Sequence, residues 1–243
     1  MILTAAHCLD EALLKYDLGV TIDVIRDLKV IVGMVYPGDN CPNKKKLEYT
    51  VKEYFIHPKF NFPYFDVGVL ELERRIEYTL GIGPICLPSF SSSSIDNLDG
   101  AAVSLSGWGA TTPNSEPSKF LIGTEQLVVI SSNLCENKTR PWVNHYASVI
   151  NRPSFLRNGH QESMEGLLCV EDQRLNGLAG SCEGDSGSPL VRVIRQSSRH
   201  NYHEQIGVVS GGICSKSNSP SVLVYIGHEE VLGFINEITN ISK

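Results

Sequence analysis

The sequence predicts an all-β chain that ends in one α-helix. Short apolar runs rich in Val, Ile and Tyr recur along the 243 residues and are separated by clusters of Gly, Pro, Asn or Ser. This is the pattern of β-strands joined by turns. The last stretch differs, because Val231, Phe234, Ile235 and Ile238 recur at helical spacing, which predicts an amphipathic helix. The predicted strands are 28–32, 49–56, 67–72, 102–105, 126–130, 190–194, 206–210 and 222–226.

A stretch with linker composition divides the chain. Residues 89–100 are rich in Ser, Asp, Asn and Gly, which favours an irregular connection. It separates a first β unit, 1–88, from a second one, 101–227, and the predicted helix spans 228–240. Residues 137–165 contain two prolines and many polar side chains with no clear period. We interpret them as a long surface insertion.

Composition narrows the class of protein. A formal net charge of −6 argues against a nucleic-acid partner, whose binding surface would be basic. No apolar run approaches the ~20 residues of a membrane span. The seven cysteines are scattered without the paired spacing of a zinc site, so we expect no metal and no cofactor. This usage, with sequons at 137–139 and 240–242, favours a disulfide-bonded secreted protein.

Three polar side chains carry the chemistry. Ser186 lies among small residues in Gly184–Leu190, and His7 lies in the apolar run Leu3–Cys8. Serine is a poor nucleophile at neutral pH unless a base takes its proton, so the pair matters more than either residue. Asp66 is a lone carboxylate at the start of an apolar strand, where it could orient the histidine. The competing interpretation is a loop aspartate just outside a strand.

The order His7, Asp66, Ser186 excludes two hydrolase classes. In subtilisin-like enzymes the catalytic residues follow one another along the chain in the order Asp, His, Ser. In lipase-like hydrolases the order is Ser, Asp, His, and the serine lies in a G-x-S-x-G motif. This chain lacks that motif, because Ser188 stands where the last glycine is required. The chain resembles the trypsin/chymotrypsin family of serine endopeptidases. The residues that carry the resemblance are Leu3–Cys8, Ile56–Pro58, Asp66–Leu72, Ile85–Pro88, Ser106–Gly109, Cys182–Leu190 and Val208–Ser210. His57 precedes a proline in one of these stretches and is predicted to be structural or exposed.

The resemblance implies a fold and roles. It implies one domain over 1–243 with two packed six-stranded antiparallel β-barrels, the first incomplete here, and a C-terminal helix. Ser186 would be the nucleophile, His7 the general base and Asp66 the orienting carboxylate. The N–H groups of Gly184 and Ser186 would form the oxyanion hole, and Ser210 resembles the family serine that helps to hold the aspartate.

The resemblance also places the substrate pocket. Its floor is Gly180, which carries no charge, so an apolar residue is expected before the cleaved bond. Glu183 lies at the rim, and Gly211 stands where the family usually has a tryptophan. The pocket residues are Gly180, Ser181, Glu183, Ser210, Gly211, Gly212 and Ser221.

The resemblance implies two disulfides, Cys135–Cys169 and Cys182–Cys214, and leaves Cys8, Cys41 and Cys86 without a partner in this sequence. Asp185 would form the ion pair with a new amino terminus after activation cleavage. Expected partners are a protein or peptide substrate, serpin-like inhibitors and an activating protease.

Because Met1 lies just before His7, we expect an N-terminally truncated copy of a secreted zymogen. The alternative is an inactive homologue or truncated product that acts as a binding or regulatory module.

Overall fold

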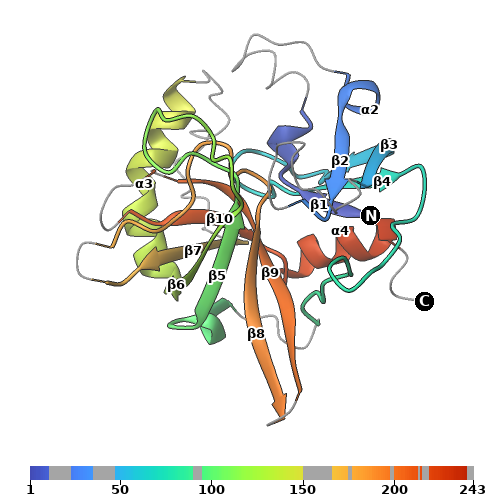
Figure 1. The fold of residues 1–243 in the computed structure, drawn as a ribbon. Helices are drawn as coiled ribbons and strands as arrows, with labels where there is room; N and C mark the ends of the chain where they lie inside the picture. Colours follow the sequence, from blue (N-terminus) through green and yellow to red (C-terminus); the bar gives the residue numbers. More distant parts are fainter. Residues whose placement is uncertain are drawn as a thin grey trace.

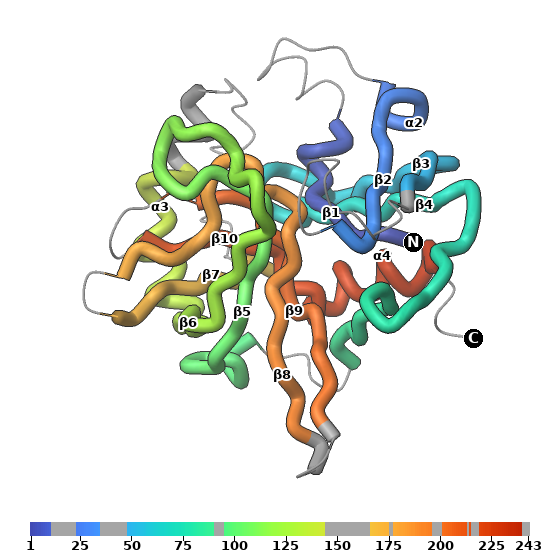
Figure 2. The backbone as a smooth tube through the Cα atoms, in the orientation of Figure 1, coloured from blue at the N-terminus to red at the C-terminus, as the bar shows by residue number. Residues whose placement is uncertain are grey.

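The computed structural model describes residues 1–10, 23–34, 47–89, 95–149, 166–174, 177–197, 200–212, 214 and 219–239. Figures 1 and 2 show a barrel on one side, a smaller sheet on the other, and helix α4 beneath their junction. Cys41, the serines of the predicted linker at 91–94 and the sequon at 240–242 lie outside the described residues.

Six strands close into an antiparallel barrel in the order β10-β7-β6-β5-β8-β9. Buried and partly exposed residues alternate along β5, as expected for a strand with one covered face. Strands β7 and β10 are buried throughout, because their outer faces also pack against apolar side chains. The strands are β5 (Ala102–Gly107), β6 (Ile122–Ile130), β7 (Leu167–Asp172), β8 (Pro189–Ser197), β9 (His200–Gly212) and β10 (Ser221–Tyr225).

The other sheet has four strands in the order β1-β4-β3-β2. Strand β1 pairs antiparallel with β4, with Ile2 opposite Leu70 and Thr4 opposite Gly68. A short helix, α2 (Val24–Asp27), precedes β2, and the side chain of Asp23 caps it by accepting the N–H of Arg26. The strands are β1 (Ile2–Thr4), β2 (Lys29–Val32), β3 (Leu47–Ile56) and β4 (Gly68–Leu72).

One apolar core joins both sheets to the terminal helix. It contains Val69 of β4, Val208 of β9 and Val224 of β10, and α4 (Glu229–Thr239) contributes Val231 and Ile235. Burying these side chains from three elements fixes the two sheets relative to each other, since each fully buried Val or Ile contributes about 1.5–3 kcal/mol. The fold class is confirmed: the chain is mostly β, with a closed six-stranded barrel, a half-barrel and a C-terminal helix. The division at 89–100 stays a prediction; the 3₁₀ turn η3 (Ile95–Leu98) lies within it.

The insertion predicted at 137–165 is wrong over its first part. Residues 137–149 belong to a helix, α3 (Ser132–Val149), and 150–165 lie outside the described residues. Among the described side chains of the helix, Cys135 and Thr139 are buried one turn apart, and the Thr139 hydroxyl donates to the Cys135 carbonyl. A largely polar surface hides helical periodicity. Disulfide Cys135–Cys169, with a Cα–Cα distance of 5.5 Å, ties α3 to β7.

Candidate active site

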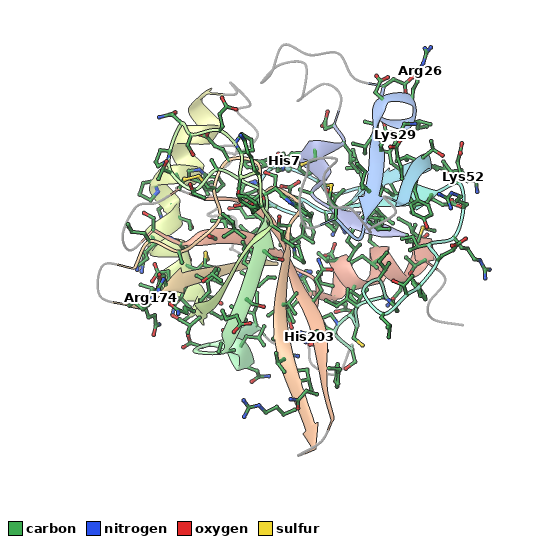
Figure 3. The ribbon with its side chains drawn as sticks, viewed as in Figure 1. His7, Arg26, Lys29, Lys52, Arg174 and His203 are labelled. Atoms are coloured by element: carbon green, nitrogen blue, oxygen red, sulfur yellow. A yellow bond between two sulfur atoms is a disulfide. The ribbon has the colours of Figure 1, made fainter. Side chains whose placement is uncertain are left out.

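His7 and Asp66 form a polar pair between two segments that flank strands β1 and β4 of the first sheet. His7 lies in the 3₁₀ turn η1 (Ala6–Cys8), which follows β1, and Asp66 lies two residues before β4. His7 Nδ1 is 2.6 Å from Asp66 Oδ2, and the His7 backbone N–H donates to Asp66 Oδ1 at 2.8 Å. The pairing of β1 with β4 brings the two residues together although 59 positions separate them. Figure 3 shows His7 near the junction of the two sheets.

Asp66 is fully buried, and a buried carboxylate is costly unless polar partners surround it. A third donor comes from the barrel: the Ser210 hydroxyl in β9 donates to Asp66 Oδ2 at 2.6 Å. One carboxylate thus contacts groups from both sheets. Since Asp66 accepts at Nδ1, it selects the tautomer of His7 whose Nε2 is free to accept a proton.

Burial and charge act on His7 in opposite directions. Burial lowers the pKa of the imidazole, but the Asp66 charge and its hydrogen bond outweigh burial and raise the pKa of His7 above its usual 6.5. The edge of the His7 ring also contacts Phe62, with centroids 5.4 Å apart. His7 is therefore a base held in one orientation.

Ser186 lies in a tight double turn that only glycine can flank. Gly184 and Gly187 have φ values of +92° and +84°, a conformation that L side chains rarely adopt. The Gly187 N–H donates to Val209 O at 2.9 Å, which attaches the turn to β9 beside Ser210. Ser186 is half-buried.

The serine turn packs directly against the segment that leads to His7. A Cβ added to Gly187 would lie 2.5 Å from Thr4 Oγ1 and 3.3 Å from the Ala5 nitrogen. Among the described residues, no hydrogen bond joins Ser186 to His7, and the N–H groups of Gly184 and Ser186 meet no acceptor. Catalytic hydrogen bonds often form only when substrate is bound, and unpaired N–H groups are what an oxyanion requires.

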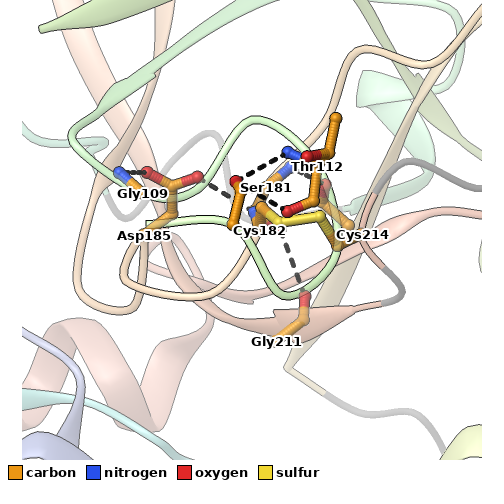
Figure 4. Close-up of a disulfide and its surroundings, with 9 residues drawn as sticks. Gly109, Thr112, Ser181, Cys182, Asp185, Gly211 and Cys214 are labelled. Carbon is orange, nitrogen blue, oxygen red and sulfur yellow. Dashed lines mark hydrogen bonds between the residues drawn. A yellow bond between two sulfur atoms is a disulfide. The ribbon is translucent and has the colours of Figure 1, made fainter. Parts of the chain in front are cut away.

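Asp185 is buried beside the serine, and backbone groups hold its carboxylate. Oδ1 accepts the N–H of Gly109 at 2.8 Å and Oδ2 accepts the N–H of Cys182 at 2.9 Å (Figure 4). Asp185 also lines a cavity of about 190 Å³. Among the described residues no cation pairs with it, so the predicted activation ion pair stays a prediction.

The predicted pocket residues converge from three segments. The Ser181 N–H donates to Ser221 Oγ at 2.7 Å, and the Ser181 hydroxyl contacts Gly211 O at 3.5 Å (Figure 4). A Cβ on Gly180 would lie 3.0 Å from Ser221 Oγ, and one on Gly212 would lie 3.2 Å from the Ser221 Cα. Disulfide Cys182–Cys214, with a Cα–Cα distance of 4.5 Å, links the segment of Ser181 to the end of β9. Glu183 is exposed.

His57 was predicted to be either structural or exposed, and the structure shows that it is buried. Its ring stacks on Phe65 at 4.8 Å and meets Phe234 of α4 edge-on at 4.9 Å. Burial lowers the pKa of His57, although the Glu230 carbonyl near Nε2 opposes this effect. A stacked neutral ring suits a residue that fixes the terminal helix against the loop before Asp66. His57 is structural.

Sequence reasoning missed Asp172, which fixes the loop that leads to Gly180. Asp172 ends β7 and accepts hydrogen bonds from the Arg174 guanidinium and from the Ala179 N–H at 3.0 Å. The Arg174 hydrogen bonds hold the pKa of the Asp172 carboxyl well below its usual 3.8, although burial opposes them. An aspartate followed two positions later by arginine is too common to single out.

We expect Asp172→Asn to destabilise the protein at pH 7 by about 1–2 kcal/mol, because hydrogen bonds to a charged acceptor are lost. A depressed pKa stabilises the fold above the unfolded-state pKa, and that contribution disappears as pH falls through the folded-state value. The difference in free energy of unfolding between wild type and variant should therefore become smaller as the pH falls below 3.8. Urea unfolding at pH 7, 4 and 2.5 measures it, with exposed Asp99→Asn as control. A difference in unfolding free energy that does not change with pH would contradict the stabilising role of the charged Asp172 carboxylate.

Cys8 is half-buried, Cys86 is exposed, and neither forms a disulfide within the described part of the chain. No group of three or more His, Cys, Asp or Glu side chains is arranged to hold a metal among the described residues. None of the described helices is both long and apolar enough to cross a bilayer.

Comparisons with known proteins show the family of the chain. A model of the trypsin family matches residues 1–234. The venom serine protease of Polistes dominula is 29% identical over 240 residues, which are 98% of this chain and 71% of that protein. The CLIP domain-containing serine protease C9 of Anopheles gambiae is 27% identical over 199 residues, 80% of this chain but only 50% of its own length. The clotting factor G beta subunit of Tachypleus tridentatus is 29% identical over 79% of this chain and 56% of that protein. The chain belongs to the trypsin family of serine proteases.

Proposed function

We propose that the chain is a secreted serine endopeptidase in which Ser186, His7 and Asp66 form the catalytic triad. The observation that carries the proposal is the 2.6 Å contact between His7 Nδ1 and Asp66 Oδ2. It supplies an oriented base beside a serine turn that packs on Thr4 and Ala5.

The mechanism follows from these positions. Nε2 of His7 takes the proton of Ser186 as the serine oxygen attacks the scissile carbonyl, and Asp66 stabilises the imidazolium that forms. The N–H groups of Gly184 and Ser186 receive the oxyanion, where one donor is worth about 3–4 kcal/mol. His7 then gives its proton to the leaving amine, and water hydrolyses the acyl-enzyme by the same route.

The test is covalent labelling with a fluorophosphonate. The folded 243-residue chain with both disulfides intact should be modified at Ser186, as located by peptide mass spectrometry. The rival function is a non-catalytic homologue that binds or regulates a partner; the absence of a Ser186–His7 hydrogen bond among the described residues favours it. Folded protein that resists the reagent even when a short peptide with a free amino terminus is added to fill the cavity beside Asp185 would support that rival.

The pH dependence follows from His7. Because the base must be neutral, the raised pKa of His7 should place the acid limb of kcat/KM above pH 6.5, with activity rising as pH increases through that limb. The free energy of unfolding should change with pH in the opposite direction. The imidazolium–carboxylate pair stabilises the fold fully below pH 6.5, and this contribution is lost as pH rises through the folded-state pKa of His7. Rates on one peptide from pH 5 to 11 measure this limb. An acid limb below pH 6 would contradict it.

We propose a preference for an apolar residue before the cleaved bond. Gly180 places no charge at the floor, and the Ser221 hydroxyl oxygen already accepts the Ser181 N–H. A buried lysine or arginine would find no counter-charge at position 180 itself. Peptides with leucine or phenylalanine at this position should be cleaved at least about tenfold faster than those with lysine. Gly180→Asp should reverse the order; unchanged selectivity would place the pocket elsewhere.

Activation and secretion are the remaining proposals. The Asp185 carboxylate beside a 190 Å³ cavity suits a primary amine, such as an amino terminus that an activating protease generates. Serpin-like inhibitors would approach the same serine as a substrate does. Secretion is supported by two disulfides and by relatives named as a venom protease and a clotting factor subunit. Asn137 of the first sequon is exposed on α3.

A further inference from the structure

An exposed apolar stripe on helix α3 surrounds the asparagine of the first sequon. The helix runs along the outer side of the barrel, away from the smaller sheet (Figure 1). Leu134 is 40% exposed, Pro141 is also exposed, and the exposed Asn137 lies between them in the chain. Residues three and four apart are neighbours on a helix surface. Asn137 therefore has one apolar side chain a turn before it and another a turn after it.

Pro141 also weakens the helix at this asparagine. Proline has no backbone N–H, so the Asn137 carbonyl, four residues earlier, receives no helical hydrogen bond from position 141. A helix that lacks such a bond opens more easily at that turn than a regular one. The segment from Asn137 to Pro141 is thus the part of α3 that depends most on its contacts with the barrel.

The other two residues of the sequon make those contacts. Lys138 Nζ lies 2.5 Å from Glu171 Oε1 in β7, and Thr139 is 2% exposed. The Thr139 hydroxyl donates to the Cys135 carbonyl at 2.7 Å. Because the acceptor motif for N-glycosylation includes the threonine as well as the asparagine, the folded chain presents only half of the motif at its surface.

We propose that Asn137 carries an N-linked glycan, and that the glycan is added before α3 packs on β7. The inference rests on the proposed secretion of the chain. The donor is an oligosaccharide linked to a lipid through diphosphate. The Asn137 amide nitrogen forms a bond to C1 of the first N-acetylglucosamine and loses a proton. The bond from C1 to the lipid diphosphate breaks, and the lipid diphosphate leaves with the electron pair.

Disulfide formation competes with this transfer. Cys135 lies two positions before Asn137, and its bond to Cys169 ties α3 to β7. Once that bond has formed, the turn that buries Thr139 is held in place and the sequon can no longer extend. Glycan transfer must therefore precede the disulfide. After folding, the sugar covers the apolar stripe around its asparagine, as expected for a bulky, solubilising group on a surface.

The site is tested by expressing the full chain behind a heterologous secretory leader in cultured mammalian cells. Asn240→Gln removes the second sequon from every protein compared, so that a shift in mobility reports Asn137. When the glycosidase PNGase F removes the sugar in H₂¹⁸O, mass spectrometry should find labelled aspartate at position 137. Asn137→Gln should lose the glycan completely, and so should Thr139→Ala. Thr139→Ser is the matched control, because it keeps the hydroxyl and should keep the glycan.

The order of events is tested on unglycosylated chain that is purified and folded with both disulfides intact. Incubated with oligosaccharyltransferase and the lipid-linked donor, this protein should accept no glycan, whereas the same chain after reduction and unfolding should accept one at Asn137. Equal transfer to both would overturn the proposed order. Secreted protein that is unmodified at Asn137 would overturn the site, and the supplied leader excludes failed secretion as its cause. A glycosylated chain that resists fluorophosphonate would support the site and refute only the proposed catalysis.

Discussion

Ser186→Ala is expected to lower kcat for peptide hydrolysis by about 10⁶-fold, the scale on which a triad fails when its nucleophile is removed. The loss should be complete for fluorophosphonate labelling as well. Ser186 is half-buried and its hydroxyl has no hydrogen-bond partner among the described residues. The free energy of unfolding should therefore stay within about 0.5 kcal/mol of wild type. Active-site titration and urea unfolding of the same preparation measure both quantities.

Ser188→Ala is the matched control, because it removes a hydroxyl from the same turn. Ser188 is also half-buried, and its backbone N–H closes the turn on Asp185 O at 2.9 Å, which alanine preserves. Activity within about tenfold of wild type would show that the Ser186 hydroxyl, and not the shape of the turn, carries the reaction. If both variants lost activity equally, the serine would be only a structural part of the turn.

Local patterns predicted most strands because each needs only a short apolar run between turn residues. All eight predicted runs overlap strands. Strand β7 was missed: Leu167–Asp172 is buried on both faces, but its sequence ends in two acidic residues that indicate a loop. Helix α3 was missed because Pro141 lies inside it and because only Cys135 and Thr139 are buried among its described side chains. Proline normally argues against a helix interior.

The candidate active site could not be predicted from local sequence patterns alone. The residue types suggested His7 as the base and Asp66 as the orienting carboxylate, and the family resemblance implied the same roles, but their contact depends on pairing between β1 and β4. Gly211 was recognised as a departure from the family, but nothing in the sequence indicates that Trp142, 69 positions earlier, occupies the space above it. Such complementarity exists only once α3 packs beside β9. Side-chain contacts between distant elements are therefore the part of the site that a single sequence does not predict.

Asp66→Asn is expected to lower kcat about 10⁴-fold with the architecture retained. The amide can present an N–H to His7 Nδ1, which would place the ring proton on Nε2, where it blocks transfer from Ser186. The charge that raises the pKa of His7 is also lost, while burial, which lowers it, remains. The pKa of His7 should therefore fall from above 6.5 to below it. Steady-state kinetics and an NMR titration of the His7 ring measure the two effects separately.

Ser210→Ala tests whether the charge of Asp66 or its hydrogen-bond network controls His7. It removes the hydroxyl that donates to Asp66 Oδ2 at 2.6 Å but leaves the carboxylate. Without that donor the negative charge acts more strongly on the imidazole, so the pKa of His7 should stay raised or rise further. The acid limb of kcat/KM would then move to higher pH, opposite to the change in Asp66→Asn. A His7 pKa that falls in both variants would mean that hydrogen bonding, and not charge, holds the base.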